Sequence, residues 1–197
     1  KIIKIVFLNN IEKFSVNYGY FLSEIQINNL KNIENLKIEK YFSQYIGKSI
    51  FLVPIQKISK DFDDNKWIDD FTIKNDYKNK IIVNIIESIP VGIHYDGEDN
   101  LLFDKNGEII DLVDLNYNLY SNLILFKGDN SLFNANFLLN SMPLFLSQIR
   151  EAIFINNRRW NLKLKNGISL KLAESNIDDS INKYITFHAN VSDQELR

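Results

Sequence analysis

Apolar and polar residues alternate along residues 158–172, RRWNLKLKNGISLKL, on both sides of an Asn-Gly pair. This alternation predicts two strands with one apolar face each, joined as a β-hairpin. A two-residue loop at Asn166 and Gly167 would turn the apolar residues of the two strands to opposite faces. A three-residue loop that ends on Gly167 in the left-handed conformation turns them to one face. We therefore predict a register with three apolar pairs: Leu164 with Ile168, Leu162 with Leu170, and Trp160 with Leu172.

The first ninety or so residues carry patterns for five successive elements. Alternation predicts strands, and apolar residues at helical spacing predict helices. Gly47 is a typical stop after the first helix, and Pro54 suits the first turn of the second. The predicted order is β-α-α-β-β, over residues 23–30, 34–46, 55–62, 70–75 and 80–87. Residues 1–20 fit either a strand or a short amphipathic helix, and the pattern leaves both open.

A strand-rich section follows Pro90. The stretch LLFDKNGEII repeats the Lys-Asn-Gly loop of the first hairpin and predicts a second one. By the same reasoning Phe103 should lie opposite Ile109, and Leu102 opposite Ile110.

Four further elements are predicted in this section: strands at 122–126 and 149–156, and helices at 131–146 and 177–191. Pro143 must kink or shorten the first of these helices because proline lacks a backbone N–H. The closing helix carries an apolar stripe on or near one face, formed by Ile177, Ile181, Tyr184, Ile185 and His188. These elements together predict an α+β fold, with a mixed, mainly antiparallel β domain and flanking helices after the first unit.

Composition narrows the class of protein. The chain has 197 residues, 45% hydrophobic and 24% charged, which suits one large globular domain or two small ones. A net charge of −2 without a basic stripe argues against a nucleic-acid partner. The lack of cysteine excludes disulfides and thiolate metal sites. The first residue is Lys1 and KIIKIVFL is too short to span a bilayer, so we expect a fragment whose membrane anchor, if any, lies upstream.

Candidate chemistry is sparse. His94 and His188 lie far apart, and no nucleophile, zinc or phosphate-binding motif is present. Aligning Gly107 with the glycine of a calcium-binding loop puts Leu102 and Val113 where carboxylates are needed, so 96–114 is expected to be hairpin turn. We predict no catalytic, cofactor or metal site and no enzyme. A cleft with a buried carboxylate of raised pKa would revive a hydrolase.

Arg158 and Arg159 allow two interpretations. They can be solvated residues at a strand entrance that cover Trp160 with a guanidinium. They can also recognise a carboxylate of a partner, for which the planar fork of arginine is suited. The residues alone leave both open.

Several motifs resemble the extracytoplasmic part of the FtsQ/DivIB family of bacterial cell-division proteins, in its alphaproteobacterial form. The family's tryptophan and strand after the second helix are similar to KWIDDFTIK here. Its domain junction is similar to ESIPVG, and its hairpin and following strand to LLFDKNGEII and SNLILFKG. Its Arg-Arg-Trp segment is similar to RRWNLKLKNGISLKL, the most specific part of the match. The likeness covers about residues 18–197.

The resemblance implies a domain organisation. Residues 1–20 would be a membrane-proximal segment, 21–90 a POTRA domain of β-α-α-β-β order, and 91–197 a C-terminal β domain. Two departures from the family are present. Ser88 stands where the family usually has arginine, and the chain ends at Arg197 before the family's last strand.

The resemblance also implies a function. The chain would be the periplasmic part of a single-pass inner-membrane protein at the division septum. Such a protein is a non-enzymatic scaffold that recruits FtsB and FtsL and helps to position septal peptidoglycan synthesis. It has no cofactor, nucleic acid or small-molecule substrate. In relatives an FtsB segment adds as a strand to the edge of the β domain, and an arginine meets its acidic residue. The expected partner-binding residues are Arg158, Arg159, Ile168, Ser169, Leu170, Lys171, Leu172 and Tyr184. The alternative is a POTRA protein of outer-membrane protein assembly or secretion.

Overall fold

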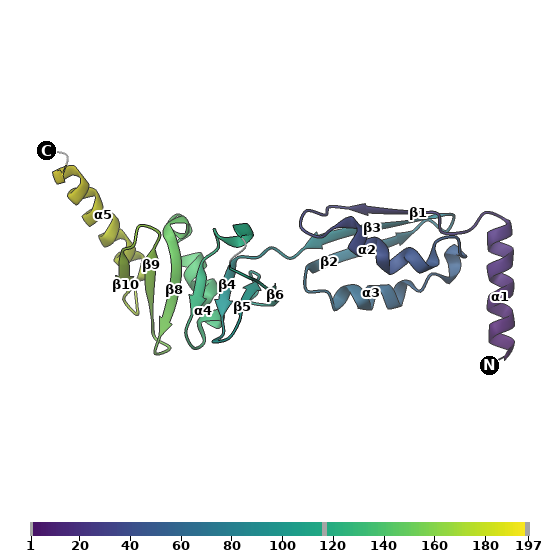
Figure 1. Cartoon of the computed structure of the whole chain (residues 1–197), viewed down its shortest axis with the longest axis horizontal. Helices are drawn as coiled ribbons and strands as arrows, with labels where there is room; N and C mark the ends of the chain where they lie inside the picture. The colour runs from purple at the N-terminus through teal and green to yellow at the C-terminus, as the bar shows by residue number, and fades with distance from the viewer. Residues whose placement is uncertain (1, 116–117, 196–197) are drawn as a thin grey trace. The chain divides into compact units, whose positions relative to one another are not determined.

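The computed structural model describes residues 2–115 and 118–195, and the side chains of residues 5–115 and 119–187. The chain divides into two compact units, Lys1–Ser88 and Ile89–Arg197 (Figure 1). Each unit has a hydrophobic cluster of its own, so each is described by itself. Both units combine helices with a sheet, which confirms the predicted α+β class.

The first unit is a three-stranded sheet with two helices packed on it. Its elements are α1 (Ile2–Asn17), β1 (Glu24–Asn28), α2 (Asn35–Phe42), the short 3-10 turns Ser43–Tyr45 and Ile50–Leu52, α3 (Ile55–Asp63), β2 (Ile68–Asn75) and β3 (Lys80–Glu87). From β1 onward this is the predicted β-α-α-β-β order. The strand β3 is central, parallel to β1 and antiparallel to β2. The segment before β1 forms a helix, so of the two structures predicted for residues 1–20 the helix is correct.

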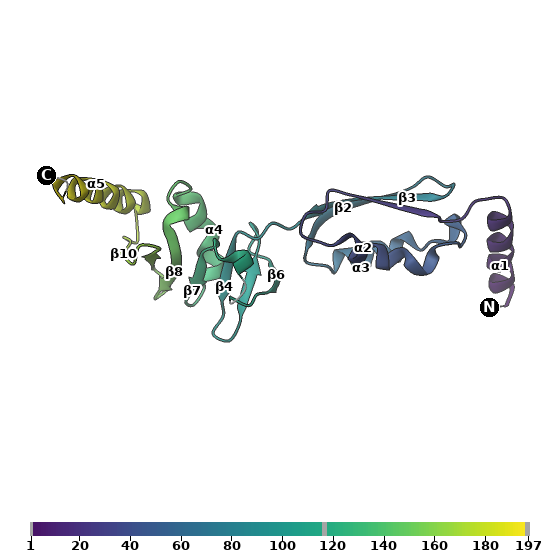
Figure 2. The same ribbon diagram turned by 45° about the horizontal axis from the view of Figure 1, so that its top comes forward.

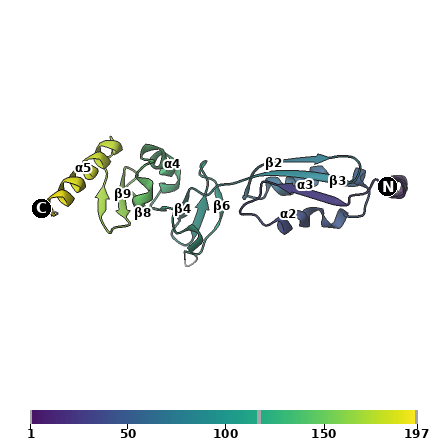
Figure 3. The same ribbon diagram turned by 90° about the horizontal axis from the view of Figure 1, so that it is seen from above.

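One face of this sheet is buried under α2 and α3 (Figures 2 and 3). The ring of Phe62, from α3, is fully buried and makes edge-on contacts with three other rings. Its partners are Tyr41 and Phe42 of α2 and Phe71 of β2, with centroid separations of 5.0, 6.2 and 5.2 Å. Edge-on aromatic pairs add to the hydrophobic gain of burial. Phe62 therefore joins both helices to the sheet.

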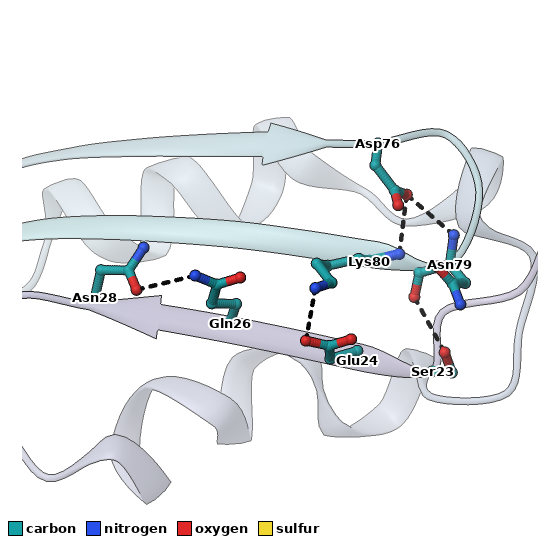
Figure 4. Close-up of polar contacts among 7 residues, drawn as sticks. All are labelled: Ser23, Glu24, Gln26, Asn28, Asp76, Asn79 and Lys80. Atoms are coloured by element: carbon teal, nitrogen blue, oxygen red, sulfur yellow. Dashed lines mark hydrogen bonds and ion pairs between the residues drawn. The ribbon is translucent and has the colours of Figure 1, made fainter.

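The other face of the sheet carries polar side chains that pair across the strands (Figure 4). Lys80 Nζ lies 2.8 Å from a carboxylate oxygen of Glu24. Asn28 Nδ2 donates to Asn84 Oδ1 at 2.9 Å, and Asn84 Nδ2 donates to Thr72 Oγ1 at 3.0 Å. Cross-strand pairs of this kind favour one register over its neighbours.

Glu87, the last residue of β3, fixes the loop between β1 and α2. Glu87 is 8% exposed, and its carboxylate accepts backbone hydrogen bonds from residues 31–33, and one from the Asn32 side chain, at 2.8–3.0 Å. Burial raises the pKa of Glu87, but these hydrogen bonds outweigh burial and hold the pKa below its ordinary value. Ser88 follows, and its Oγ donates to the Lys66 carbonyl at 2.8 Å.

The second unit is a seven-stranded sheet with helices packed against it. Its elements are β4 (Gly92–Tyr95), β5 (Asn100–Phe103), β6 (Ile109–Leu112), the 3-10 turn Asn118–Tyr120, β7 (Leu125–Lys127), α4 (Ser131–Ser141), the 3-10 turn Leu146–Gln148, β8 (Ile149–Ile155), β9 (Arg159–Leu164), β10 (Ser169–Lys171) and α5 (Ile177–Glu195). The strand order is β10-β9-β8-β7-β4-β5-β6. The pairs β4–β7 and β7–β8 are parallel and the other four are antiparallel, which agrees with a mixed, mainly antiparallel sheet.

The core of the second unit is built around Trp160. This side chain is 2% exposed, and its ring lies 4.7 Å from that of Phe154 and 5.7 Å from that of Phe126. A ring of this size removes a large apolar area from water. Trp160 is therefore enclosed by neighbouring strands and needs no arginine to cover it.

The register of the 158–172 hairpin is confirmed. Leu162 pairs with Leu170, and the Leu164 N–H donates to the Ile168 carbonyl at 2.8 Å. Gly167 takes the left-handed conformation, at φ 90°. The expected core face is wrong at one position, because Ile168 is 37% exposed. Ile168 lies beside the loop, where little of the core reaches it.

Four other expectations are corrected by the structure or fall partly outside the described residues. The second hairpin pairs Phe103 with Ile109 as predicted, but Leu102 pairs with Asp111 rather than Ile110, because a bulge follows Leu102. The helix predicted over 131–146 ends at Ser141, before Pro143, and the strand predicted at 122–126 is formed by Leu125–Lys127. The side chain of His188, placed on the stripe of the closing helix, lies outside the described side chains.

Gly128 is a position where the fold requires glycine. Its φ is 98°, and a Cβ atom there would collide with the carbonyl oxygen of Phe154. We expect Gly128→Ala to destabilise the second unit by about 2–5 kcal/mol, because left-handed strain adds to overpacking. Gly167→Ala is the matched control, since it has similar strain at φ 90° but open space around the Cβ position, and should lose about 1–2 kcal/mol. Urea unfolding followed by fluorine NMR of fluorotryptophan at Trp160 measures both. Equal losses would contradict the collision.

Glu87→Gln should destabilise the first unit by about 1.5–3 kcal/mol, because hydrogen bonds to a charged acceptor contribute that much. The folded pKa is lowered, so the stabilisation by Glu87 is present above its unfolded pKa of about 4.3 and is lost as pH falls through the folded pKa. Unfolding reported by fluorotryptophan at Trp67, from neutral pH downward, should show a smaller acid loss in the variant. Glu24→Gln, which removes an exposed ion pair, should change stability by less than about 1 kcal/mol. An unchanged acid loss in Glu87→Gln would count against this account.

Candidate functional site

β10 is an edge of the second unit's sheet, and β9 is its strand neighbour. The Leu164 N–H donates to the Ile168 carbonyl at 2.8 Å, and the Leu172 N–H donates to β9 at 2.9 Å. In an antiparallel ladder, hydrogen-bonded pairs recur at every second residue. The backbone N–H and C=O groups of Ser169 and Lys171 therefore point away from β9, toward the outer edge.

The side chains along this edge divide between the two faces of the sheet. Leu172 is 2% exposed and Leu170 is partly buried, both against the core. Ser169 and Lys171 are exposed and belong to the opposite face. A strand that added to this edge would therefore meet an apolar face on one side and a polar face on the other.

Tyr184, also expected at the site, lies near the loop end of the hairpin. It comes from α5, and its ring lies 5.8 Å from that of Phe145. Asn166 Nδ2 donates to the Tyr184 hydroxyl at 3.4 Å. The side chain packs against the core cluster, so the structure gives Tyr184 a part in joining α5 to the hairpin.

Arg158 and Arg159 lie at the other end of the hairpin, where β9 begins and the chain leaves β10. Arg158 Nε is 3.4 Å from Glu174 Oε2, and both side chains are about 60% exposed. Arg159 opens β9 opposite Ile155 and is partly buried. The structure thus brings both arginines to the C-terminal end of β10, where a carboxylate of the same chain contacts one of them.

A group of charges that the sequence did not reveal lies on the polar face of the same sheet. Glu151, at the centre of β8, is 14% exposed and lies 3.1 Å from Lys163 Nζ and 3.4 Å from Lys127 Nζ. Burial raises the pKa of Glu151, but its hydrogen bond to Lys163 and the nearby cations lower it further than burial raises it. These residues come from three strands, so no local spacing could have joined them.

Reactive chemistry is not gathered at this edge or elsewhere in the described part of the chain. His94 Nδ1 lies 3.1 Å from the Ser131 hydroxyl, but Ser131 is fully buried, and burial lowers the pKa of His94. The described carboxylates with shifted pKa values are all lowered: Asp76, Glu87, Asp96 and Glu151. Nothing in these shifts favours the hydrolase alternative.

The described residues lack two further features. Among them no three acidic, histidine or cysteine side chains are grouped so that they could hold a metal ion. No described helix combines the length and apolar character needed to cross a bilayer.

Comparison with known proteins gives matches over both units. Residues 22–88 match the model of the POTRA domain, FtsQ-type, and residues 93–196 match the model "Cell division protein FtsQ/DivIB, C-terminal". The chain is 26% identical over 179 residues to the cell division protein FtsQ of Rickettsia bellii, covering 89% of this chain and 66% of that protein. It is 27% identical over 170 residues to the FtsQ of Agrobacterium fabrum, covering 83% and 52%. The chain thus spans about two thirds of the length of the Rickettsia bellii protein and about half of the length of the Agrobacterium fabrum protein.

A solved structure is also similar, at a lower level. It is the major extracytoplasmic domain of the cell division protein DivIB from Geobacillus stearothermophilus, with 12% sequence identity and a TM-score of 0.39. The match covers 50% of this chain and 89% of that one.

Proposed function

The chain belongs to the FtsQ/DivIB family of cell-division proteins, and we propose that it is a non-enzymatic scaffold of the division machinery. In this proposal it is the periplasmic part of a single-pass inner-membrane protein concentrated at the septum. It recruits FtsB and FtsL and links them to septal peptidoglycan synthesis. The FtsQ-type matches over both units support this, whereas no observation favours the alternative of outer-membrane protein assembly or secretion.

The observation that carries the proposal is the open edge of β10. Ser169 and Lys171 present backbone donors and acceptors to that edge. Unpaired groups of this kind are a template for strand addition by a second chain. We propose that an FtsB segment adds here, with apolar residues on the side of Leu170 and Leu172 and polar residues on the side of Lys171.

The two arginines complete the proposed site. An added strand that continued past the C-terminal end of β10 would bring its side chains close to Arg158 and Arg159. An acidic residue there would compete with Glu174 for Arg158. Ion pairs between exposed side chains contribute only about 0–1 kcal/mol, so breaking the pair with Glu174 costs little free energy. The planar guanidinium then gives the partner carboxylate a directional, two-point contact.

Ser169→Pro should weaken the binding of a partner that adds as a strand to β10, and it should leave the fold intact. Proline removes the outward N–H of residue 169, which has no partner in β9, and edge strands tolerate such a proline. Titration of a peptide with the C-terminal sequence of FtsB against the full chain, by calorimetry, should show about a fivefold or greater loss of affinity, as expected for one or more lost hydrogen bonds. Ser169→Ala keeps the N–H and should bind like the original chain. Equal binding by the proline variant would rule out addition at β10.

One of the two arginines is expected to contact the carboxylate of the same peptide. Reversing the charge of that arginine should weaken peptide binding by about 1–3 kcal/mol. The affected arginine is identified by testing Arg158→Glu and Arg159→Glu separately. Lys165→Glu, an equal charge change in the exposed loop at the other end of the hairpin, is the control and should have little effect. Reversing the peptide's acidic residue to lysine should restore binding to the affected variant. If neither arginine variant changes the affinity, the arginines are ordinary solvated residues.

A further inference from the structure

A long segment of the second unit carries no charge. Residues 131–149 include α4 and the turn that follows it, and none of these 19 residues is Asp, Glu, Lys or Arg. Charged residues make up 24% of the whole chain. The outward face of a surface helix is normally charged or polar. The absence of charge therefore requires an explanation in terms of what the surface contacts.

Large apolar side chains are also exposed on this segment. Phe133 and Phe137, one helical turn apart on α4, are 91% and 65% exposed, and Leu144 just beyond the helix is 95% exposed. These three side chains contribute little to the core of the unit. Single exposed apolar residues are ordinary, but three on one uncharged segment indicate a surface that is used in binding.

The same segment lines a groove. The groove lies between residues 141–148 and the first half of α5 and has a volume of about 440 Å³. Its apolar part is formed by Met142, Phe145 and Ile181, all 5% exposed or less, with Leu144 and Ile185 beside them. Asp178 is the charged residue of the lining. The volume suits one or two large side chains of a partner.

The charges of the groove favour one kind of occupant. Binding to an anionic lipid surface draws on lysines and arginines, which residues 131–149 lack. A two-fold contact between the grooves of two copies would bring the two Asp178 carboxylates together, and like charges there oppose association. A partner helix with an apolar stripe matches the uncharged strip, and a single cation on it matches Asp178.

We propose that the surface formed by Phe133, Phe137, Leu144 and the groove beside α5 binds an amphipathic helix of another protein. Apolar residues of that helix at i and i+3 or i+4 enter the groove, and a lysine or arginine meets Asp178. This surface includes none of the residues proposed for strand addition. Its failure and the failure of the β10 site can therefore be told apart.

The first test asks whether these residues serve the fold. Leu144→Asp and Phe137→Asp should leave the unfolding midpoint of the second unit unchanged, as read from fluorotryptophan at Trp160 in the full chain. Phe145→Asp, which changes a buried residue of the groove floor, should lower it. A large loss in both Leu144→Asp and Phe137→Asp would show that the apolar side chains stabilise the unit, which would overturn the proposal.

The second test identifies the occupant. A photoreactive phenylalanine analogue at 133, 137 or 144 of the full-length protein in dividing cells should crosslink to another protein, and an analogue at the exposed Glu98, in the turn before β5 and outside both proposed surfaces, should not. The crosslinked peptide, identified by mass spectrometry, should have helical apolar spacing and one cation. Crosslinks to a second copy of this chain, to lipid, or to no molecule would overturn the proposal.

The third test uses the identified peptide as a synthetic probe. Leu144→Asp should lower the affinity for this peptide about tenfold or more, as expected for a residue at the centre of an interface. Asp178→Lys should also weaken it, and exchanging the peptide's cation for glutamate should restore affinity for that variant. Ser169→Pro should bind it normally. Unchanged affinity in Leu144→Asp, or no rescue of Asp178→Lys, would overturn the proposal while leaving strand addition at β10 unaffected.

Discussion

The register between β9 and β10 determines both the core and the candidate edge of the second unit. A slip of one residue would turn Leu170 and Leu172 away from the core. It would also exchange the backbone groups that face β9 with those that face outward, so Ser169 and Lys171 would no longer present them. The three-residue loop that ends on Gly167, at φ 90°, selects the observed register. One tight turn therefore decides which groups a partner can reach, and the apolar pairing that stabilises the domain also orients its edge.

The sequence predicts those features whose causes lie close together in the chain. The hairpin register follows from alternation on either side of one loop, and the helix end before Pro143 follows from one proline. Features that join distant segments were missed. Glu87 holds a loop that lies more than fifty residues earlier, and Glu151 meets cations from two other strands. Neither set of contacts can be predicted before the order of the strands in the sheets is known. The bulge after Leu102 is not predicted for another reason, because alternation alone predicts hairpin pairing without interruption.

The open edges of the two sheets differ in how they resist unwanted pairing. In the first unit, β2 begins with an irregular register between Ile68 and Asp70, and Asp69 and Asp70 are exposed there. Bulges and charges on an edge discourage addition of another strand. β10 is only three residues long and carries the exposed Lys171. A short edge offers few hydrogen bonds, so a strand that lacks matching side chains gains little from it. Specificity at β10 must therefore come from its neighbours, including Arg158.

The size of β10 also limits how tightly it can hold a partner. Ser169 and Lys171 can exchange at most four backbone hydrogen bonds with an added strand, worth about 2–6 kcal/mol. An arginine–carboxylate contact adds about 1.5–3 kcal/mol, and association itself costs at least about 4 kcal/mol. What remains is at most about 5 kcal/mol, which corresponds at best to binding slightly tighter than millimolar, whereas micromolar binding needs about 8 kcal/mol. A second, apolar contact is required. The groove beside α5 is well placed to provide it, because Phe145 in its lining contacts Tyr184, which contacts Asn166 in the hairpin loop. A partner that reached both surfaces would bind the second at high effective concentration.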